Sequence, residues 1–104
     1  MVESKTYTIS SAFIKQPIEI TCTHVGEQPI EMKIRSEGKM YEQEFELVSR
    51  LVTFIFQSMD PFFLVEEFYG IGDPGGSQWA NGERYLSIYS EIAGVLKVFY
   101  EEIG

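Results

Sequence analysis

The spacing of apolar residues changes at about residue 40, and this change restricts the chain to a fold that mixes strands and helices. Before that point apolar and polar residues alternate, which is typical of strands with one buried face. After it apolar residues recur at every third or fourth position, which is typical of amphipathic helices. We therefore predict an α+β domain over residues 1–104, in which an N-terminal antiparallel β meander packs on a long helix followed by two further helices.

The meander is predicted from three β-rich segments, at residues 6–9, 18–25 and 30–35. Pro17 and two turn segments, at 26–29 and 36–39, separate them. The positions expected to face the core are Ile18, Ile20, Cys22, Ile30, Met32 and Ile34, with His24 at the end of the same face. Glu19, Thr21 and Thr23 are expected to face solvent, so the sheet should have one polar face.

Three apolar stripes predict the helices. The first helix carries the stripe Tyr41, Phe45, Val48, Val52, Ile55 and Met59. Asp60 is expected to cap the second helix, with Pro61 at its first position and Gly70 at its stop. The apolar face of this helix is expected to comprise Phe62, Val65, Phe68 and Tyr69. The last helix should run from about Ser87 to Glu102 and bury Ile88, Ile92, Val95 or Leu96, Phe99 and Ile103.

A second apolar stripe on the first helix points some way round from the first stripe, and it indicates an interface between subunits. We expect a homo-oligomer, most simply a twofold dimer, because a monomer would leave a large apolar patch in water. The residues expected in the interface are Leu47, Leu51, Phe54, Phe62 and Phe63. The alternative is that the last helix covers this second face within one chain.

The charge balance excludes two classes of partner. Eight Lys and Arg residues against 16 Asp and Glu residues give a formal net charge of −8, which repels duplex nucleic acid and an anionic membrane. A basic protein surface, a cation, or a small anion held by local basic residues remains possible as a ligand. The N-terminus lacks an apolar signal segment and no apolar run is long enough to span a membrane, so we expect a cytoplasmic protein.

A glycine-rich segment at residues 70–84 is the main candidate for a binding site. Its first six residues match G-x-G-x-x-G, but a predicted helix precedes them where the dinucleotide fingerprint needs a strand. The segment leads into the last helix, whose free N–H groups and dipole favour an anion. The expected ligand-binding residues are Gly75, Gly76, Ser77, Gln78, Trp79, Asn81, Arg84 and Ser87. Trp79 is expected to plug the core and pin the loop, the alternative being a stacking or interface residue.

The residues that could carry catalysis do not combine into a site, so we expect no enzyme, metal or cofactor. Cys22 is the only cysteine and His24 the only histidine, too few for a tetrahedral zinc site. Cys22 should be a buried small hydrophobe and His24 a packed or surface residue. The glutamate clusters are expected to be solvated helix faces or an acidic docking face for a basic partner.

The order of segments resembles the TSCPD domain, a small module at the C-terminus of adenosylcobalamin-dependent ribonucleotide reductases. The segments that carry the likeness are residues 29–34, 45–52, 59–61, 68–71 and 86–93. Of the five name-giving positions only Ser87 matches, and Leu86, Ile88, Tyr89 and Ser90 replace threonine, cysteine, proline and aspartate. Gly72 and Asp73 stand where the family has a second cysteine, so the resemblance carries over no metal or redox role. It implies the fold, with Ser90 as a helix N-cap candidate, and it suggests a nucleotide-like ligand.

These observations lead to two hypotheses for the function. The first is a non-catalytic ligand-binding or regulatory module that holds a nucleotide-like anion near the glycine-rich segment and the last helix. The alternative is an acidic protein-interaction module, such as a phage-type inhibitor that docks a host protein, including one that sequesters a signalling nucleotide.

Overall fold

The computed structural model describes residues 1–58 and 60–104, and it shows a three-stranded meander with helices against one face. The strands β1 (Val2–Ser10), β2 (Pro17–Val25) and β3 (Gln28–Ser36) pair antiparallel in the order β1-β2-β3. The helices are α1 (Glu42–Ser58), α2 (Phe62–Tyr69) and α3 (Ile88–Ile103). The predicted α+β class and the order of its elements are confirmed. Met59, which was expected in the buried stripe of the first helix, lies outside the described residues.

The predicted alternation in the sheet is confirmed except at one position. Ile18, Ile20, Cys22 and His24 are buried on β2, whereas Glu19 between them is exposed. On β3, Met32 and Ile34 are buried, but Ile30 is only half-buried and Pro29 is buried in its place. The reason is a register shift opposite Thr23 and His24. There β3 has one extra residue, Ile30, so the alternation of buried and exposed positions changes by one residue.

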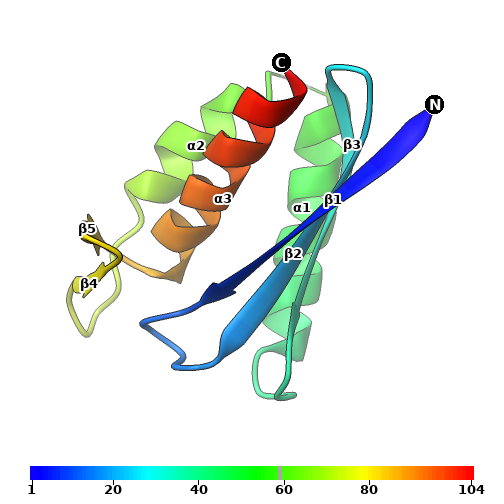
Figure 1. The fold of residues 1–104 in the computed structure, drawn as a ribbon. Helices are drawn as coiled ribbons and strands as arrows, with labels where there is room; N and C mark the ends of the chain where they lie inside the picture. Colours follow the sequence, from blue (N-terminus) through cyan, green and yellow to red (C-terminus); the bar gives the residue numbers. More distant parts are fainter. Residues whose placement is uncertain (59) are drawn as a thin grey trace.

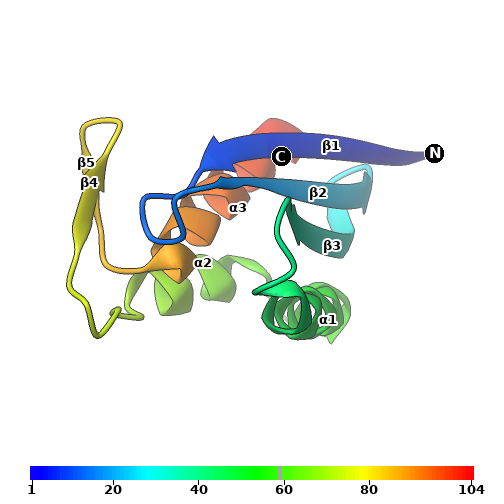
Figure 2. The same ribbon diagram turned by 90° about the horizontal axis from the view of Figure 1, so that it is seen from below.

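Helix α1 runs along the edge of β3, at the end of the sheet opposite β1 (Figure 2). Its buried side is formed by Phe45, Ser49, Val52 and Phe56. Phe56 was not in the predicted stripe, while Val48 and Ile55, which were, are half-buried. The buried face is therefore rotated from the predicted one, because the helix contacts an edge strand and not the middle of a sheet face.

Helices α2 and α3 pack side by side, and α3 lies against β2 of the main sheet. In α3 the predicted stripe is confirmed, with Ile92, Val95, Leu96 and Phe99 buried. In α2 the prediction for Phe62 was wrong, because Leu64 and Val65 are buried and Phe62 is half exposed. The helix starts one residue later than predicted, with Pro61 as its N-cap residue, although Asp60 Oδ1 still accepts from Phe62 N at 3.0 Å.

The predicted start of the last helix is confirmed at Ser87 and not at Ser90. Ser87 is the N-cap residue, and its Oγ accepts from Tyr89 N at 3.1 Å. Ser90 takes the third helical position, where its Oγ accepts from Ser87 N at 3.0 Å. The two serines thus cap each other's backbone in a reciprocal pair, which fixes where α3 begins.

A small hairpin replaces the second part of the irregular loop expected at residues 70–84. It consists of β4 (Gln78–Ala80) and β5 (Glu83–Tyr85), and it projects beyond the end of the main sheet (Figures 1 and 2). Asn81 and Gly82 form its turn with φ values of 52° and 80°. Asn-Gly is the sequence favoured in a two-residue turn in which both φ values are positive. Asn81-Gly82 could therefore have predicted the hairpin from the sequence.

Candidate functional site

The hairpin brings together only some of the residues that were expected to bind an anion, since Trp79 and Arg84 lie opposite each other in it. Gly75, Gly76 and Ser77 lie in the segment before β4, Gln78 and Trp79 lie on β4, and Arg84 lies on β5. Trp79 is 72% exposed, so the expectation that it plugs the core was wrong. It stands on a projecting two-stranded hairpin that cannot bury a side chain of this size. A stacking or interface role for Trp79 stays a prediction.

The N-terminus of α3 is already satisfied by the protein itself. Ser87 is buried and its hydroxyl caps the helix, while Arg84 Nε donates to Ser77 Oγ at 2.8 Å within the hairpin. The carboxylate of Glu91, in the first turn, is also buried. These groups hold the hydrogen bonds and the charge that a bound anion would otherwise supply.

A groove of about 710 Å³ lies between the C-terminal half of β1 and one face of α3. Residues 6–10 of β1 form one wall, and α3 residues from Glu91 to Glu101 form the other. Tyr69 of α2 and the β4–β5 hairpin complete the lining. Of the eight predicted ligand-binding residues, only Asn81 lines this groove.

The lining of the groove is acidic and aromatic. It contains the exposed carboxylates of Glu83 and Glu101 and the buried carboxylate of Glu91, against the single ammonium group of Lys97. Burial, the hydrogen bond from its hydroxyl to Glu83 Oε2 at 3.0 Å and nearby negative charge raise the pKa of Tyr85 to about 12. Such a lining favours a cationic ligand over an anionic one.

The wall formed by β1 is also an open sheet edge. The N–H groups of Met32 and Ile34 point away from β2 toward α1, and hydrogen-bonding direction alternates along an antiparallel strand. With the observed register, Tyr7 of β1 therefore exchanges hydrogen bonds with Ile20 of β2. It follows that Ser4, Thr6 and Thr8 turn their N–H and C=O groups away from the sheet. Among the described residues only β2 pairs with β1.

The opposite edge of the sheet is closed by side chains of α1. Met32 N donates to Thr53 Oγ1 and Ile34 N donates to Ser49 Oγ, both at 3.0 Å. Thr53 Oγ1 also donates to the Met32 carbonyl at 3.3 Å, and Gln57 Nε2 donates to the Ile30 carbonyl at 3.2 Å. These contacts block β3 from pairing with another strand, which is how proteins commonly protect an edge.

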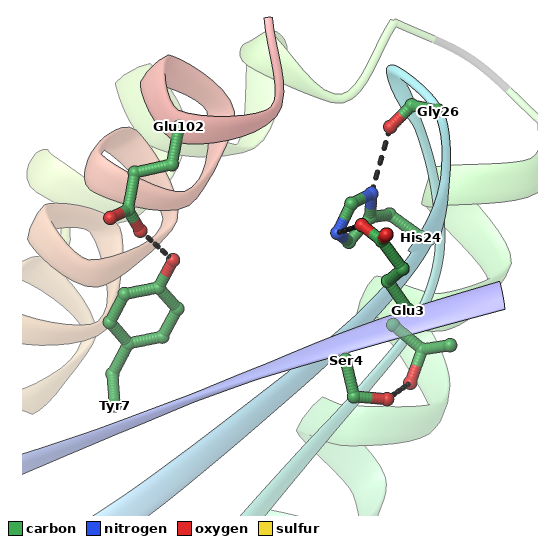
Figure 3. Close-up of polar contacts among 7 residues, drawn as sticks. Glu3, Ser4, Tyr7, His24, Gly26 and Glu102 are labelled. Carbon is green, nitrogen blue, oxygen red and sulfur yellow. Dashed lines mark hydrogen bonds and ion pairs between the residues drawn. The ribbon is translucent and has the colours of Figure 1, made fainter. Parts of the chain in front are cut away.

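Side-chain contacts on both faces of the sheet hold β1 in place (Figure 3). Tyr7 Oη donates to Glu102 on α3, and this hydrogen bond together with burial raises the pKa of Tyr7 well above its usual range. Ser4 and Thr23 share a hydrogen bond of 3.1 Å on the outer face. Glu3 Oε2 lies 3.6 Å from His24 Nε2. The open edge is therefore a fixed strand and not a loose terminus.

Cys22 and His24 are both buried, as expected from their strand face. Burial raises the pKa of the Cys22 thiol to about 12, which disfavours the thiolate that a nucleophile needs. His24 Nδ1 donates to the Gly26 carbonyl at 2.8 Å, and the imidazole ring packs edge-on against Phe99. No group of three or more His, Cys, Asp or Glu residues is placed to hold a metal ion within the described part of the chain.

The residues predicted to form an oligomer interface are all at the surface. Leu47, Leu51 and Phe54 on α1 are 58%, 54% and 65% exposed, and Phe62 and Phe63 on α2 are 50% and 47% exposed. The first three are spaced by four and three positions, so they form one stripe on the side of α1 away from the core. The last helix does not cover this stripe. The dimer itself stays a prediction.

We expect the protein to have a mass near twice 11.9 kDa in light scattering at micromolar concentration, because the exposed stripe would be covered by a second copy. Phe54→Glu should return the mass to about 11.9 kDa, since a charge at the centre of an apolar interface opposes association. Ile71→Glu, also at an exposed apolar position but outside the predicted interface, should leave the mass unchanged. A wild-type mass of one chain that persists on concentration would contradict the prediction.

The comparisons with known proteins add no relative: the chain matches no family model, no curated protein and no solved structure. The resemblance to the TSCPD domain therefore stays a prediction. In the described part of the chain, none of the helices has the length and apolar character needed to cross a membrane. The fold is that of an α+β domain. In its three-stranded sheet the β1 edge is open and the β3 edge is covered by α1.

Proposed function

We propose that this protein is a non-catalytic binding module that captures an extended, basic segment of a partner protein along β1. The observation that carries this proposal is the difference between the two edges of the sheet. The β3 edge is closed by Ser49, Thr53 and Gln57, whereas the β1 edge is open beside a groove. A partner segment that added itself as a strand would satisfy the free backbone groups of β1 and place alternate side chains in the groove.

The charge of the partner segment follows from the lining of the groove. The exposed carboxylates of Glu83 and Glu101 against one ammonium group attract lysine or arginine side chains, and the net charge of the whole chain supports the same choice. The proposal corresponds to the protein-interaction alternative from the sequence. The capped N-terminus of α3 gives less support to a nucleotide-like anion at that helix.

The backbone pattern of β1 defines a specific test of strand pairing. Ser4, Thr6 and Thr8 present outward N–H groups, whereas the N–H groups of Lys5 and Tyr7 are used within the sheet. The test adds a nine-residue peptide, the length of β1, in which lysine alternates with threonine, to isotope-labelled protein. Amide hydrogen exchange should slow at Ser4, Thr6 and Thr8 on binding, while Lys5 and Tyr7 are protected already.

Thr6→Pro should weaken binding of this peptide by about tenfold or more, because proline removes an outward N–H and obstructs pairing at the centre of β1. Thr6→Val is the matched control, since it keeps the N–H and a β-branched side chain, and it should bind within about twofold of wild type. Calorimetric titration measures both affinities. A matched peptide with glutamate in place of lysine should bind more weakly than the lysine peptide.

Two results would contradict the proposal. One is binding of the lysine peptide that is equal in wild type and Thr6→Pro. The other is the absence of any change in exchange at Ser4, Thr6 and Thr8 when the peptide is present at saturating or millimolar concentration.

A further inference from the structure

The part of the groove beside the hairpin brings two aromatic rings together with carboxylates. Tyr69 comes from α2 and Tyr85 from β5, and the Tyr69 hydroxyl and the edge of the Tyr85 ring lie near Gly94 of α3. The same groove is lined by two carboxylates. Glu83 lies two residues before Tyr85 on β5, and Glu101 lies two helical turns after Gly94 on α3. Three elements of the chain, α2, β5 and α3, therefore contribute to one small region of the surface.

Gly94 leaves space beside the two tyrosines. A Cβ atom at this position would lie 3.8 Å from Tyr69 Oη and 3.8 Å from Tyr85 Cε1, which is ordinary van der Waals contact. Packing therefore does not require glycine here, and glycine inside a helix costs about 1 kcal/mol relative to alanine. The missing side chain leaves room for about one methyl group beside the two tyrosines at the floor of the groove.

The electrostatic environment of the two tyrosines opposes negative charge. The pKa of Tyr69 is raised by burial and by the negative charges of Glu83 and Glu101. The pKa of Tyr85 is raised by burial, by its hydrogen bond to Glu83 and by nearby acidic groups that include Glu91. Both phenols are therefore neutral at physiological pH, and the field that penalises a phenolate stabilises a cation at the same place.

We infer that Tyr69, Tyr85, Glu83 and Glu101 form a subsite beside Gly94 for the cationic side chain of arginine or lysine. The inference rests on the proposed function, since the side chain would belong to the segment that pairs with β1. Aromatic faces attract a cation through the ring quadrupole, and a planar guanidinium can also stack on them. The carboxylates neutralise its charge from the side of the hairpin and from α3.

A small-molecule probe tests the subsite separately from strand pairing. N-acetyl-arginine N-methylamide would be titrated into labelled protein up to about 50 mM, a range that detects even millimolar affinity. The citrulline analogue has nearly the same shape without the charge, and it should bind about five- to thirtyfold more weakly if the cation is recognised. The shifts should centre on the Gly94 amide and on the rings of Tyr69 and Tyr85.

Variants assign the binding to these residues. Glu101→Gln and Tyr69→Leu should each weaken the arginine probe by about two- to tenfold, through loss of a charge and of a ring. Glu66→Gln, which removes the same charge from an exposed position on α2 outside the groove lining, should have no effect. The lysine analogue of the probe shows which of the two cations binds more tightly.

The outcomes separate the subsite from the proposed function. The arginine probe does not pair with β1, so its binding is measured independently of strand pairing. If the arginine and citrulline probes bind equally, or if neither shifts Gly94 at the highest concentration, the subsite is wrong. If the probe binds at Gly94 but the lysine peptide does not protect β1, the subsite stands and strand pairing is wrong.

Discussion

Replacing Phe99 by alanine is expected to lower the free energy of unfolding by about 4 kcal/mol, which lies within the range measured for buried phenylalanines. Phe99 has no exposed surface and is the last buried residue of α3 toward its C-terminus. Its ring lies 5.7 Å from that of His24, 6.3 Å from that of Phe56 and 5.8 Å from that of Tyr100, measured between centroids. Its loss would open a cavity at the point where the sheet, α1 and α3 meet.

Equilibrium unfolding in urea, followed by far-ultraviolet circular dichroism, measures this effect. Phe54→Ala is the matched control, because it deletes the same atoms from an exposed position on α1 and should change the stability of one chain by less than about 0.5 kcal/mol. The unfolding measurement is made at a protein concentration at which light scattering shows the mass of one chain. A loss below about 1.5 kcal/mol for Phe99→Ala would contradict its place at the centre of the core.

Glu91→Ala is expected to destabilise the protein by about 3 kcal/mol, because this buried carboxylate connects α3 to the segment after β1. Its Oε1 accepts from Ser11 Oγ at 2.7 Å and its Oε2 accepts from Ala12 N at 3.0 Å. Hydrogen bonds to a charged group contribute about 1.5–3 kcal/mol each, and the donors would be left without a partner. The position in the first turn of α3 adds a favourable interaction with the helix dipole.

Ser11 allows the role of Glu91 to be separated from its bulk. Ser11 Oγ donates to Glu91 and also accepts from Phe13 N at 3.2 Å and from Ile14 N at 3.3 Å. In a double-mutant cycle, Glu91→Ala and Ser11→Ala should show a coupling energy of about 1–2 kcal/mol. Glu91→Gln, which keeps one acceptor oxygen, should lose less stability than Glu91→Ala. Additive effects of the two alanine variants would contradict the proposed connection.

The sequence predicted the elements that carry a regular hydrophobic period, and it missed those that depend on a turn or on side-chain contacts. The central part of the α3 stripe was predicted correctly, since Ile92, Val95, Leu96 and Phe99 are buried on one face, while Ile88 and Ile103 at its ends are half-buried. The β4–β5 hairpin was missed because its strands are too short for a period, although Asn81 and Gly82 specify its turn. Ser90 was taken as a helix N-cap candidate because it stands at the aspartate position of the family that the chain resembles, whereas it occupies the third position of the helix.

The candidate site was largely beyond prediction, for a reason that can be seen in its composition. The groove combines β1, α2, the hairpin and α3, and no local pattern reports that Tyr7, Tyr69 and Tyr85 line the same space. The sequence pointed to residues 75–87 because a glycine-rich segment before a helix favours an anion. It could not show that Arg84 would bond to Ser77 or that Ser87 and Ser90 would cap the helix.

The sequence by itself determined the α+β class, the burial of Cys22 and the exposure of Leu47, Leu51 and Phe54, because each follows from hydrophobic period along one element. Only the tertiary structure decided which sheet edge stays open. Ser49, Thr53 and Gln57 are ordinary polar helix residues until α1 lies along β3, where their side chains occupy the outward backbone groups of that strand. Nothing along β1 itself differs enough to predict its open edge, because that edge is defined by the helix that packs at the other end of the sheet.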